Sequence, residues 1–139
     1  MMKLINILPV KNTLGEGIQW HQESQSVWWT DILNAQLYQY HPATDKTTIY
    51  PMPERVGCFA FTSNKELLII AFASGLAFYH LKTHHIGWLA RPEGNITGNR
   101  FNDGKVDRNG RFWAGTMVED DKNSIQLGSL YMLDGNQKC

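Results

Sequence analysis

Four polar side chains stand close together late in this sequence, at Arg100, Asn102, Asp103 and Lys105, with Phe101 among them. A guanidinium, an amide, a carboxylate and an ammonium group offer more hydrogen-bond donors and acceptors than a strand requires. Such a cluster suits a site that faces a polyhydroxylated or anionic small molecule. The local pattern leaves one alternative open, a solvated loop in which Asn-Asp-Gly only makes a turn.

The residues after this cluster predict a hairpin that would position it. Asn109-Gly110 is typical of a two-residue type I′ turn, because both central positions of that turn need positive φ. Residues 112–114, Phe-Trp-Ala, then resume a strand-like run. The polar cluster is therefore expected in a loop immediately ahead of paired strands over 105–107 and 111–115.

Short strands separated by turn residues are expected along the whole chain. Gly, Pro, Asn and β-branched residues interrupt every window that would otherwise favour a helix, so the fold class is all-β. The expected strands cover residues 3–10, 18–20, 26–31, 36–40, 47–50, 58–61, 66–72, 76–81, 86–90, 105–107, 111–115 and 128–133.

These strands repeat in units of similar length. The second strands of successive units begin 40 and then 45 residues apart, and the third strands 39 and then 53 apart, with a polar insertion over 119–126. Four short strands at a period of about 40–50 residues favour the blades of a β-propeller, with a β-sandwich as the alternative. The second strands begin near Ser26, Glu66 and Arg111, and the third near Gln36, Gly75 and Gly128.

Composition and charge exclude several classes of function. The 139 residues are 42% hydrophobic and 19% charged, which is typical of a soluble globular domain. Thirteen basic and thirteen acidic residues cancel, so no electrostatic argument supports a nucleic-acid partner or an anionic membrane. No apolar run approaches the length of a membrane span.

The cysteines and the N-terminus indicate a cytoplasmic protein. Cys58 and Cys139 do not form a disulfide framework, and reduced thiols are expected. The apolar run over 3–10 is interrupted by Asn6 and Pro9, which is poor for a signal peptide and favours a first strand.

Two stretches resemble a known family. The string RFNDGKVDRNGRFWAGTM, residues 100–117, resembles the signature of the senescence marker protein/gluconolactonase/luciferin-regenerating family, which includes regucalcin. The strings LGEGIQW at 14–20 and WWTDI at 28–32 resemble that family's N-terminal LGEGPxW…WVDI pattern. The resemblance covers about residues 14–133. It implies a single domain over 1–139 that corresponds to the N-terminal half of a six-bladed propeller, or about three blades.

The resemblance also implies a site. Glu16 matches a ligand of the family's divalent cation (Ca²⁺, Zn²⁺, Mn²⁺ or Mg²⁺), whereas the other two ligands and the catalytic base would lie beyond Cys139. Arg100 and Asn102 match substrate-orienting residues. Glu119 and Asp120 both qualify as a further acidic substrate contact, and Asp120 is the closer match in register. From its local sequence alone, Glu16 would be a solvated loop acid.

The resemblance implies metal-dependent hydrolysis of a sugar lactone to an aldonic acid. Two alternatives stay open: a calcium-binding regulatory protein of the regucalcin type, and an inactive truncated homologue. Because three blades leave unpaired sheet faces, the ring would be closed by a missing C-terminal half or by a second copy in a two-fold homodimer.

Overall fold

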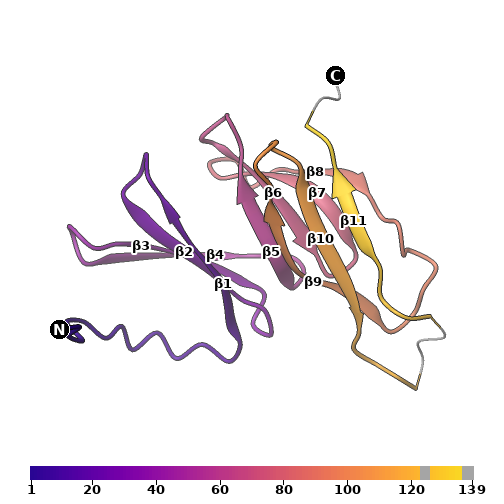
Figure 1. Cartoon of the computed structure of the whole chain (residues 1–139), viewed down its shortest axis with the longest axis horizontal. Helices are drawn as coiled ribbons and strands as arrows, with labels where there is room; N and C mark the ends of the chain where they lie inside the picture. Colours follow the sequence, from indigo (N-terminus) through magenta and orange to yellow (C-terminus); the bar gives the residue numbers. More distant parts are fainter. Residues whose placement is uncertain (123–125, 136–139) are drawn as a thin grey trace.

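The structure is a computed structural model that describes residues 1–122 and 126–135. Over these residues eleven strands form three antiparallel sheets (Figure 1). The all-β prediction is confirmed. The first sheet has the order β1 (Gly15–His21), β2 (Ser26–Asp31), β3 (Gln36–His41) and β4 (Lys46–Pro51). The second has the order β5 (Val56–Phe61), β6 (Leu67–Phe72), β7 (Gly75–His80) and β8 (Ile86–Ala90). The third has the order β9 (Asn99–Val106), β10 (Phe112–Val118) and β11 (Leu130–Leu133).

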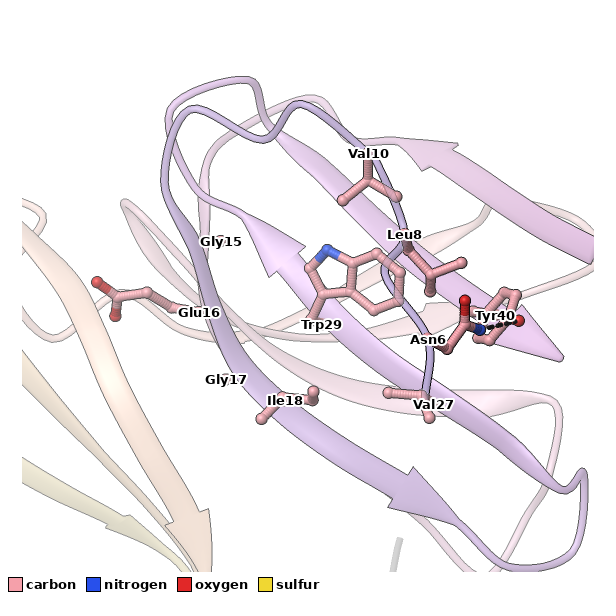
Figure 2. Close-up of a pocket in the computed structure, with 10 residues that line it drawn as sticks. All are labelled: Asn6, Leu8, Val10, Gly15, Glu16, Gly17, Ile18, Val27, Trp29 and Tyr40. Atoms are coloured by element: carbon pink, nitrogen blue, oxygen red, sulfur yellow. Dashed lines mark hydrogen bonds between the residues drawn. The ribbon is translucent and has the colours of Figure 1, made fainter. Parts of the chain in front are cut away.

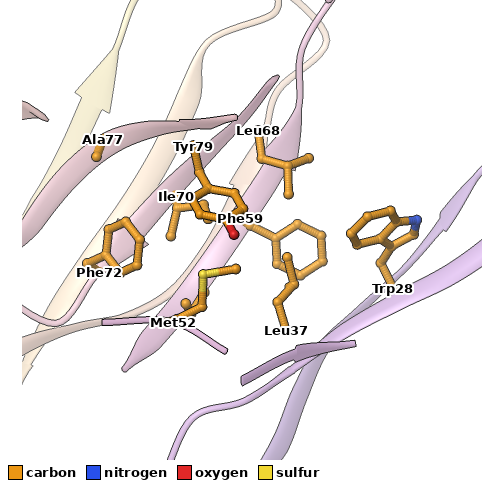
Figure 3. Packing of buried hydrophobic residues seen from close by; sticks show 10 residues of the cluster. Trp28, Leu37, Met52, Phe59, Leu68, Ile70, Phe72, Ala77 and Tyr79 are labelled. Carbon is orange, nitrogen blue, oxygen red and sulfur yellow. The ribbon is translucent and has the colours of Figure 1, made fainter. Parts of the chain in front are cut away.

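The second sheet is buried on both faces. Because side chains of a strand alternate between faces, β5 and β6 supply one set of residues to each neighbouring sheet. Figure 3 shows the first set, in which Phe59, Leu68 and Ile70 pack with Trp28 and Leu37 of the first sheet. The second set packs against the third sheet and consists of Cys58, Ala60, Ile69, Ala71 and Leu76 with Phe101, Phe112 and Ala114.

This double burial explains the sequence of β6, LLIIAF, which shows no polar alternation. A strand with one face in water would place a polar residue at every second position, whereas a strand covered on both sides is apolar throughout. Each fully buried Leu, Ile or Phe contributes roughly 1.5–3 kcal/mol relative to an exposed one. The second sheet is therefore the hydrophobic centre of the described chain.

The second and third sheets approach each other closely at a glycine. A Cβ atom on Gly57 of β5 would lie 2.5 Å from the carbonyl oxygen of Asn102 and 2.7 Å from that of Phe101. Gly104 of β9 is similarly restricted, because its Cβ would lie 2.7 Å from the Cys58 sulfur. Only hydrogen in place of a side chain permits this spacing.

The expected strand over 3–10 is absent, so that prediction is wrong. The segment runs as an extended coil beside the first sheet, visible at the left of Figure 1. Leu8 and Val10 pack on a cluster of Trp29, Tyr38 and Tyr40. Its apolar residues are therefore used in side-chain packing, without the backbone pairing that defines a strand.

The expected two-residue turn at Asn109-Gly110 is also wrong. Val106 pairs with Phe112, so the connection has five residues, and of the two expected positions only Gly110 has positive φ, 77°. The cause is Asp107, whose carboxylate accepts the backbone N–H groups of Asn109 and Arg111 and thereby shapes a wider loop. Its pKa lies below the ordinary value, chiefly because the Trp113 indole also donates to it.

Two segments named in the sequence analysis fall wholly or partly outside the described residues. The polar insertion over 119–126 lies partly outside the described residues, and Cys139 lies outside them entirely. Within the described ranges, no helix is long and apolar enough to span a membrane.

We predict that Gly57→Ala lowers the free energy of unfolding by about 2 kcal/mol, because the added methyl group must displace the β9 backbone. Gly87→Ala is the matched control, since nothing lies within 4 Å of its added Cβ. Urea unfolding followed by tryptophan fluorescence measures both. Equal free energies of unfolding for the two variants would contradict the close approach.

Candidate functional site

The first strands of the three sheets lie side by side and begin at the same level. Glu16 of β1 pairs with Thr30 of β2, and the Thr30 hydroxyl donates to the carbonyl of Val56, where β5 begins, at 3.0 Å. Further along, the Gln19 side-chain amide donates to the carbonyl of Phe59 at 2.8 Å. Strands β1 and β5 therefore advance together from a common starting level.

Strand β9 follows the same direction beside β5 (Figure 1). Gly57 faces the carbonyls of Phe101 and Asn102, and one residue later Cys58 faces Gly104. The beginnings of β1, β5 and β9 therefore form one edge of the molecule. We call this edge the rim and define it as residues 15–16, 54–57, 99–102 and 118–120.

Arg100 lies at the rim, and its guanidinium is buried, with only 7% of the side chain exposed. It lies in strand β9 and not in the loop that the sequence predicted, because β9 begins at Asn99. Its Nε donates to Glu119 at 2.8 Å, and its Nη1 donates to the Phe101 carbonyl and to Oδ1 of Asn102, both at 3.0 Å. Three hydrogen bonds thus hold the guanidinium plane in one orientation.

Glu119 is bound by two arginines. Arg55 places Nη1 2.6 Å from Oε1 and Nη2 2.6 Å from Oε2, while Arg100 Nε shares Oε1. The hydrogen bond from Arg55 holds the pKa of Glu119 below its usual range, against the raising effect of partial burial, and Arg100 adds to the lowering. Glu119 therefore stays ionised and acts as the acceptor that joins the two guanidinium groups.

Asp120 follows at the same edge and is exposed. The backbone N–H groups of Glu119 and Asp120 both donate to the carbonyl of Gly98, at 2.8 and 3.0 Å. This pair of hydrogen bonds fixes the chain immediately before β9 to the chain immediately after β10. Arg100 thus contacts both Asn102 and Glu119, and Asp120 follows Glu119 along the backbone.

Glu16 is separate from this group. Its side chain is exposed, and Figure 2 shows its carboxylate directed away from Trp29 and Leu8. Among the described residues its carboxylate makes no hydrogen bond or ion pair. The next residue, Gly17, has a φ of 66°. This conformation suits glycine and lets the chain bulge between Glu16 and Gln19.

Asp31 holds the loop that leads to Glu16. Its buried carboxylate accepts the backbone N–H groups of Thr13 and Leu14 at 2.9 and 3.0 Å. Burial alone would raise the pKa of Asp31, but these bonds and those from the Asn34 and Asn12 side chains outweigh it and lower the pKa. Asp31 at the end of β2 therefore fixes the loop that precedes β1.

A hollow of about 560 Å³ lies between β1 and the N-terminal coil, and Gly15, Glu16 and Gly17 of β1 are among its lining residues. Its walls are mostly apolar and include Leu8, Val10, Val27 and Trp29 (Figure 2). It brings together few polar groups, whereas the rim holds a cluster of them. The rim therefore offers a hydroxylated ligand more hydrogen-bonding groups than these apolar walls do.

The residues present fit a divalent cation in type and not in number. Glu16 is an exposed oxygen ligand of the kind that Ca²⁺ or Mg²⁺ prefers. Within residues 1–122 and 126–135, however, no group of three or more His, Cys, Asp or Glu side chains could hold a metal ion. A fully coordinated cation therefore requires ligands in addition to those described.

Comparison with known proteins shows which family the sequence matches. Residues 14–139 match the sequence pattern of the SMP-30/Gluconolactonase/LRE-like region. The chain belongs to this family. It is 33% identical to an L-arabinolactonase of Azospirillum brasilense over 91% of its own length and 42% of the relative's. It is 39% identical to a 6-deoxy-6-sulfogluconolactonase of Pseudomonas putida over 84% of its length and 40% of the relative's.

A solved structure shows the same arrangement of sheets. The calcium-binding protein regucalcin from Agrobacterium tumefaciens aligns with a TM-score of 0.78 and 31% identity, over 88% of this chain and 40% of that one. The three sheets are blades of the family's six-bladed β-propeller, so the expected family and fold are confirmed. The chain spans about 40% of the length of the relatives it matches.

One residue of the rim, Arg55, was missed by the sequence analysis. Its partner Glu119 is 64 positions away, so no local pattern joins the two. The repeat could have indicated it, because Glu16, Arg55 and Arg100 are 39 and 45 residues apart, close to the blade period. Each stands at or immediately before the first strand of its blade.

We predict that Asp31→Asn lowers the free energy of unfolding at pH 7 by about 2 kcal/mol, because an amide N–H would face backbone donors. Since the folded pKa is depressed, the contribution of Asp31 is present above its ordinary value of 3.8 and is lost as pH falls below it. Urea unfolding at pH 7 and pH 3 should therefore show a smaller difference from wild type at pH 3. Glu23→Gln, at an exposed position, is the control. A difference that is equal at both pH values would contradict the role of Asp31.

Proposed function

We propose that the protein acts as a metal-dependent sugar lactone hydrolase in which this chain supplies the substrate-orienting part of the site. The observation that carries the proposal is the buried guanidinium of Arg100, fixed at the rim beside Asn102. The chain's membership of a lactonase family, with relatives named as lactonases for two sugars, supports it.

Each rim residue has a role in this proposal. Arg100 and Asn102 would donate hydrogen bonds to the hydroxyls and ring oxygen of the lactone, and their fixed orientation lowers the entropic cost of binding. Because Glu119 already accepts from two arginines, we assign it to orienting Arg100 and assign direct contact with the substrate to Asp120. In the reaction, water adds to the lactone carbonyl, the ring C–O bond breaks, and an aldonic acid is released.

Glu16 would contribute one ligand to the cation. A bound Ca²⁺, Zn²⁺, Mn²⁺ or Mg²⁺ would polarise the lactone carbonyl and lower the pKa of water. A single carboxylate binds such ions weakly, because affinity rises with the number and charge of ligands. The other ligands and the general base would come from the remaining blades, whether these belong to further polypeptide or to a second copy of the chain.

A second candidate function is calcium-dependent regulation. The observation that favours it is the 31% identity to a solved structure named as a calcium-binding protein. In this case Glu16 would bind the cation, and the protein would not hydrolyse a lactone at the rim. An inactive homologue that retains only the fold is the remaining alternative.

We expect acid release from glucono-1,5-lactone, followed in a pH-stat, to exceed the spontaneous rate when Ca²⁺, Mn²⁺ or Zn²⁺ is present and to cease with a chelator. Arg100→Ala should reduce turnover about 100-fold, because loss of the oriented guanidinium misplaces the lactone. Glu16→Gln should weaken activation by the metal. Glu23→Gln, an exposed acid at the far end of β1, is the control.

Absence of turnover above the chelated rate would contradict hydrolysis by this chain. Calorimetric titration with Ca²⁺ then separates the alternatives. Saturable binding that is lost in Glu16→Gln would support the regulatory function, whereas no binding would support the inactive homologue.

A further inference from the structure

We propose that Arg55 is a positioning residue that holds Arg100 in place by fixing the carboxylate of Glu119. The contact crosses from the second blade to the third. Its effect on the lactone rests on the function proposed above, but its effect on the orientation of Arg100 does not.

The geometry of the three side chains is specific. Arg55 contacts both oxygens of Glu119 through its two terminal nitrogens, each at 2.6 Å, which is the parallel fork typical of the strongest arginine–carboxylate pairs. This fork fixes the plane of the carboxylate as well as its position. Arg100 makes only one bond to the same group, from Nε to Oε1 at 2.8 Å.

The fork is anchored at both ends. The carbonyl of Arg55 accepts the N–H of Ala73 at 2.8 Å, which ties its backbone to the second blade. The N–H of Glu119 donates to Gly98 at 2.8 Å, which ties the acid to the start of the third. Between these anchors Glu119 is directed at Arg100, whose own burial prevents water from replacing the bond.

The partial exposure of Arg55 and Glu119 indicates that their contact orients Arg100 and adds little to the stability of the fold. About a third of the side chains of Arg55 and Glu119 remains in contact with water, at 34% and 32%. Ion pairs of this exposure add little to folding, because solvent screens the charges. Removing Arg55 should therefore leave the blades packed by their apolar core while it releases the carboxylate that orients Arg100.

Lysine at position 55 distinguishes charge from geometry. Its ammonium is a point charge that cannot contact both carboxylate oxygens in a planar fork. If net charge alone mattered, Arg55→Lys would match wild type. If the fork fixes the carboxylate plane, Arg55→Lys would fall between wild type and Arg55→Ala.

The experiment is side-chain NMR of the ¹⁵N-labelled 139-residue chain. The Nε–H signal of Arg100, assigned by its loss in Arg100→Lys, should exchange with solvent slowly in wild type. We expect exchange at least tenfold faster in Arg55→Ala and an intermediate rate in Arg55→Lys. The control is Arg111→Ala, which removes an arginine–carboxylate pair with Asp107 in the hairpin loop beyond β9 and should leave the rate unchanged.

The same variants are then assayed on glucono-1,5-lactone with a metal. We expect kcat/KM to fall about tenfold in Arg55→Ala and to recover partly in Arg55→Lys, with an unchanged urea midpoint. Unchanged Nε–H exchange alongside wild-type turnover would overturn the role of Arg55 and leave the proposed function standing. Faster Nε–H exchange in Arg55→Ala, with no turnover in wild type or in any variant, would support the role of Arg55 and contradict the proposed function. If Arg55→Ala does not fold, Arg55→Lys and Glu119→Gln provide the same comparison.

Discussion

Burial of the second blade on both faces is the constraint on which the rest of the structure depends. The side chains of β5 and β6 point alternately to the first and third sheets, so the flanking blades pack on a common apolar centre. A shift of one residue in either strand would exchange the two sets and place Phe59 and Ile70 where only Cys58 and Ala71 fit. The register of β5 therefore sets where the neighbouring blades lie.

The rim is a consequence of that register. Once β5 is fixed, the Thr30 hydroxyl meets Val56 on one side and the carbonyls of Phe101 and Asn102 meet Gly57 on the other. The side chains of Arg55 and Arg100 then meet at Glu119. No contact joins Glu16 to Arg100 among the described residues. The charged side chains are thereby separated from the apolar centre. The core sets the positions of the strands, and the strand ends carry the charged groups.

Much of this could be predicted from the sequence. The recurrence of short strands identified the blades, and the two motif strings singled out Glu16, Arg100 and Asn102, which lie at the rim and whose roles stay predictions. The apolar segment over 3–10 was misassigned because hydrophobic residues do not reveal whether they pack by side chains or pair by backbone. The loop after β9 was misassigned because Asp107 reorganises it through its carboxylate, an effect that the Asn-Gly pair does not show.

The least predictable feature is the bridge between blades. Arg55 and Glu119 are far apart in sequence, and the local sequence around each one is that of an ordinary solvated turn. Only the packing of the second blade against the third brings them together. Such contacts between repeats follow from register, which depends on the whole core, and are therefore the last features that a local pattern reveals.

The central claim is that β1, β5 and β9 begin at one level and form a single rim. A nitroxide attached to Glu16→Cys in a Cys139→Ser background tests it, since burial raises the pKa of the Cys58 thiol and protects it from labelling. Strand β5 is about 20 Å long, so the two ends are distinguishable. Within β5 and β9 and the residues just before them, the account predicts that paramagnetic broadening of amide signals is stronger at residues 54–57 and 99–102 than at Phe61 and Val106. Stronger broadening at Phe61 and Val106 would contradict it.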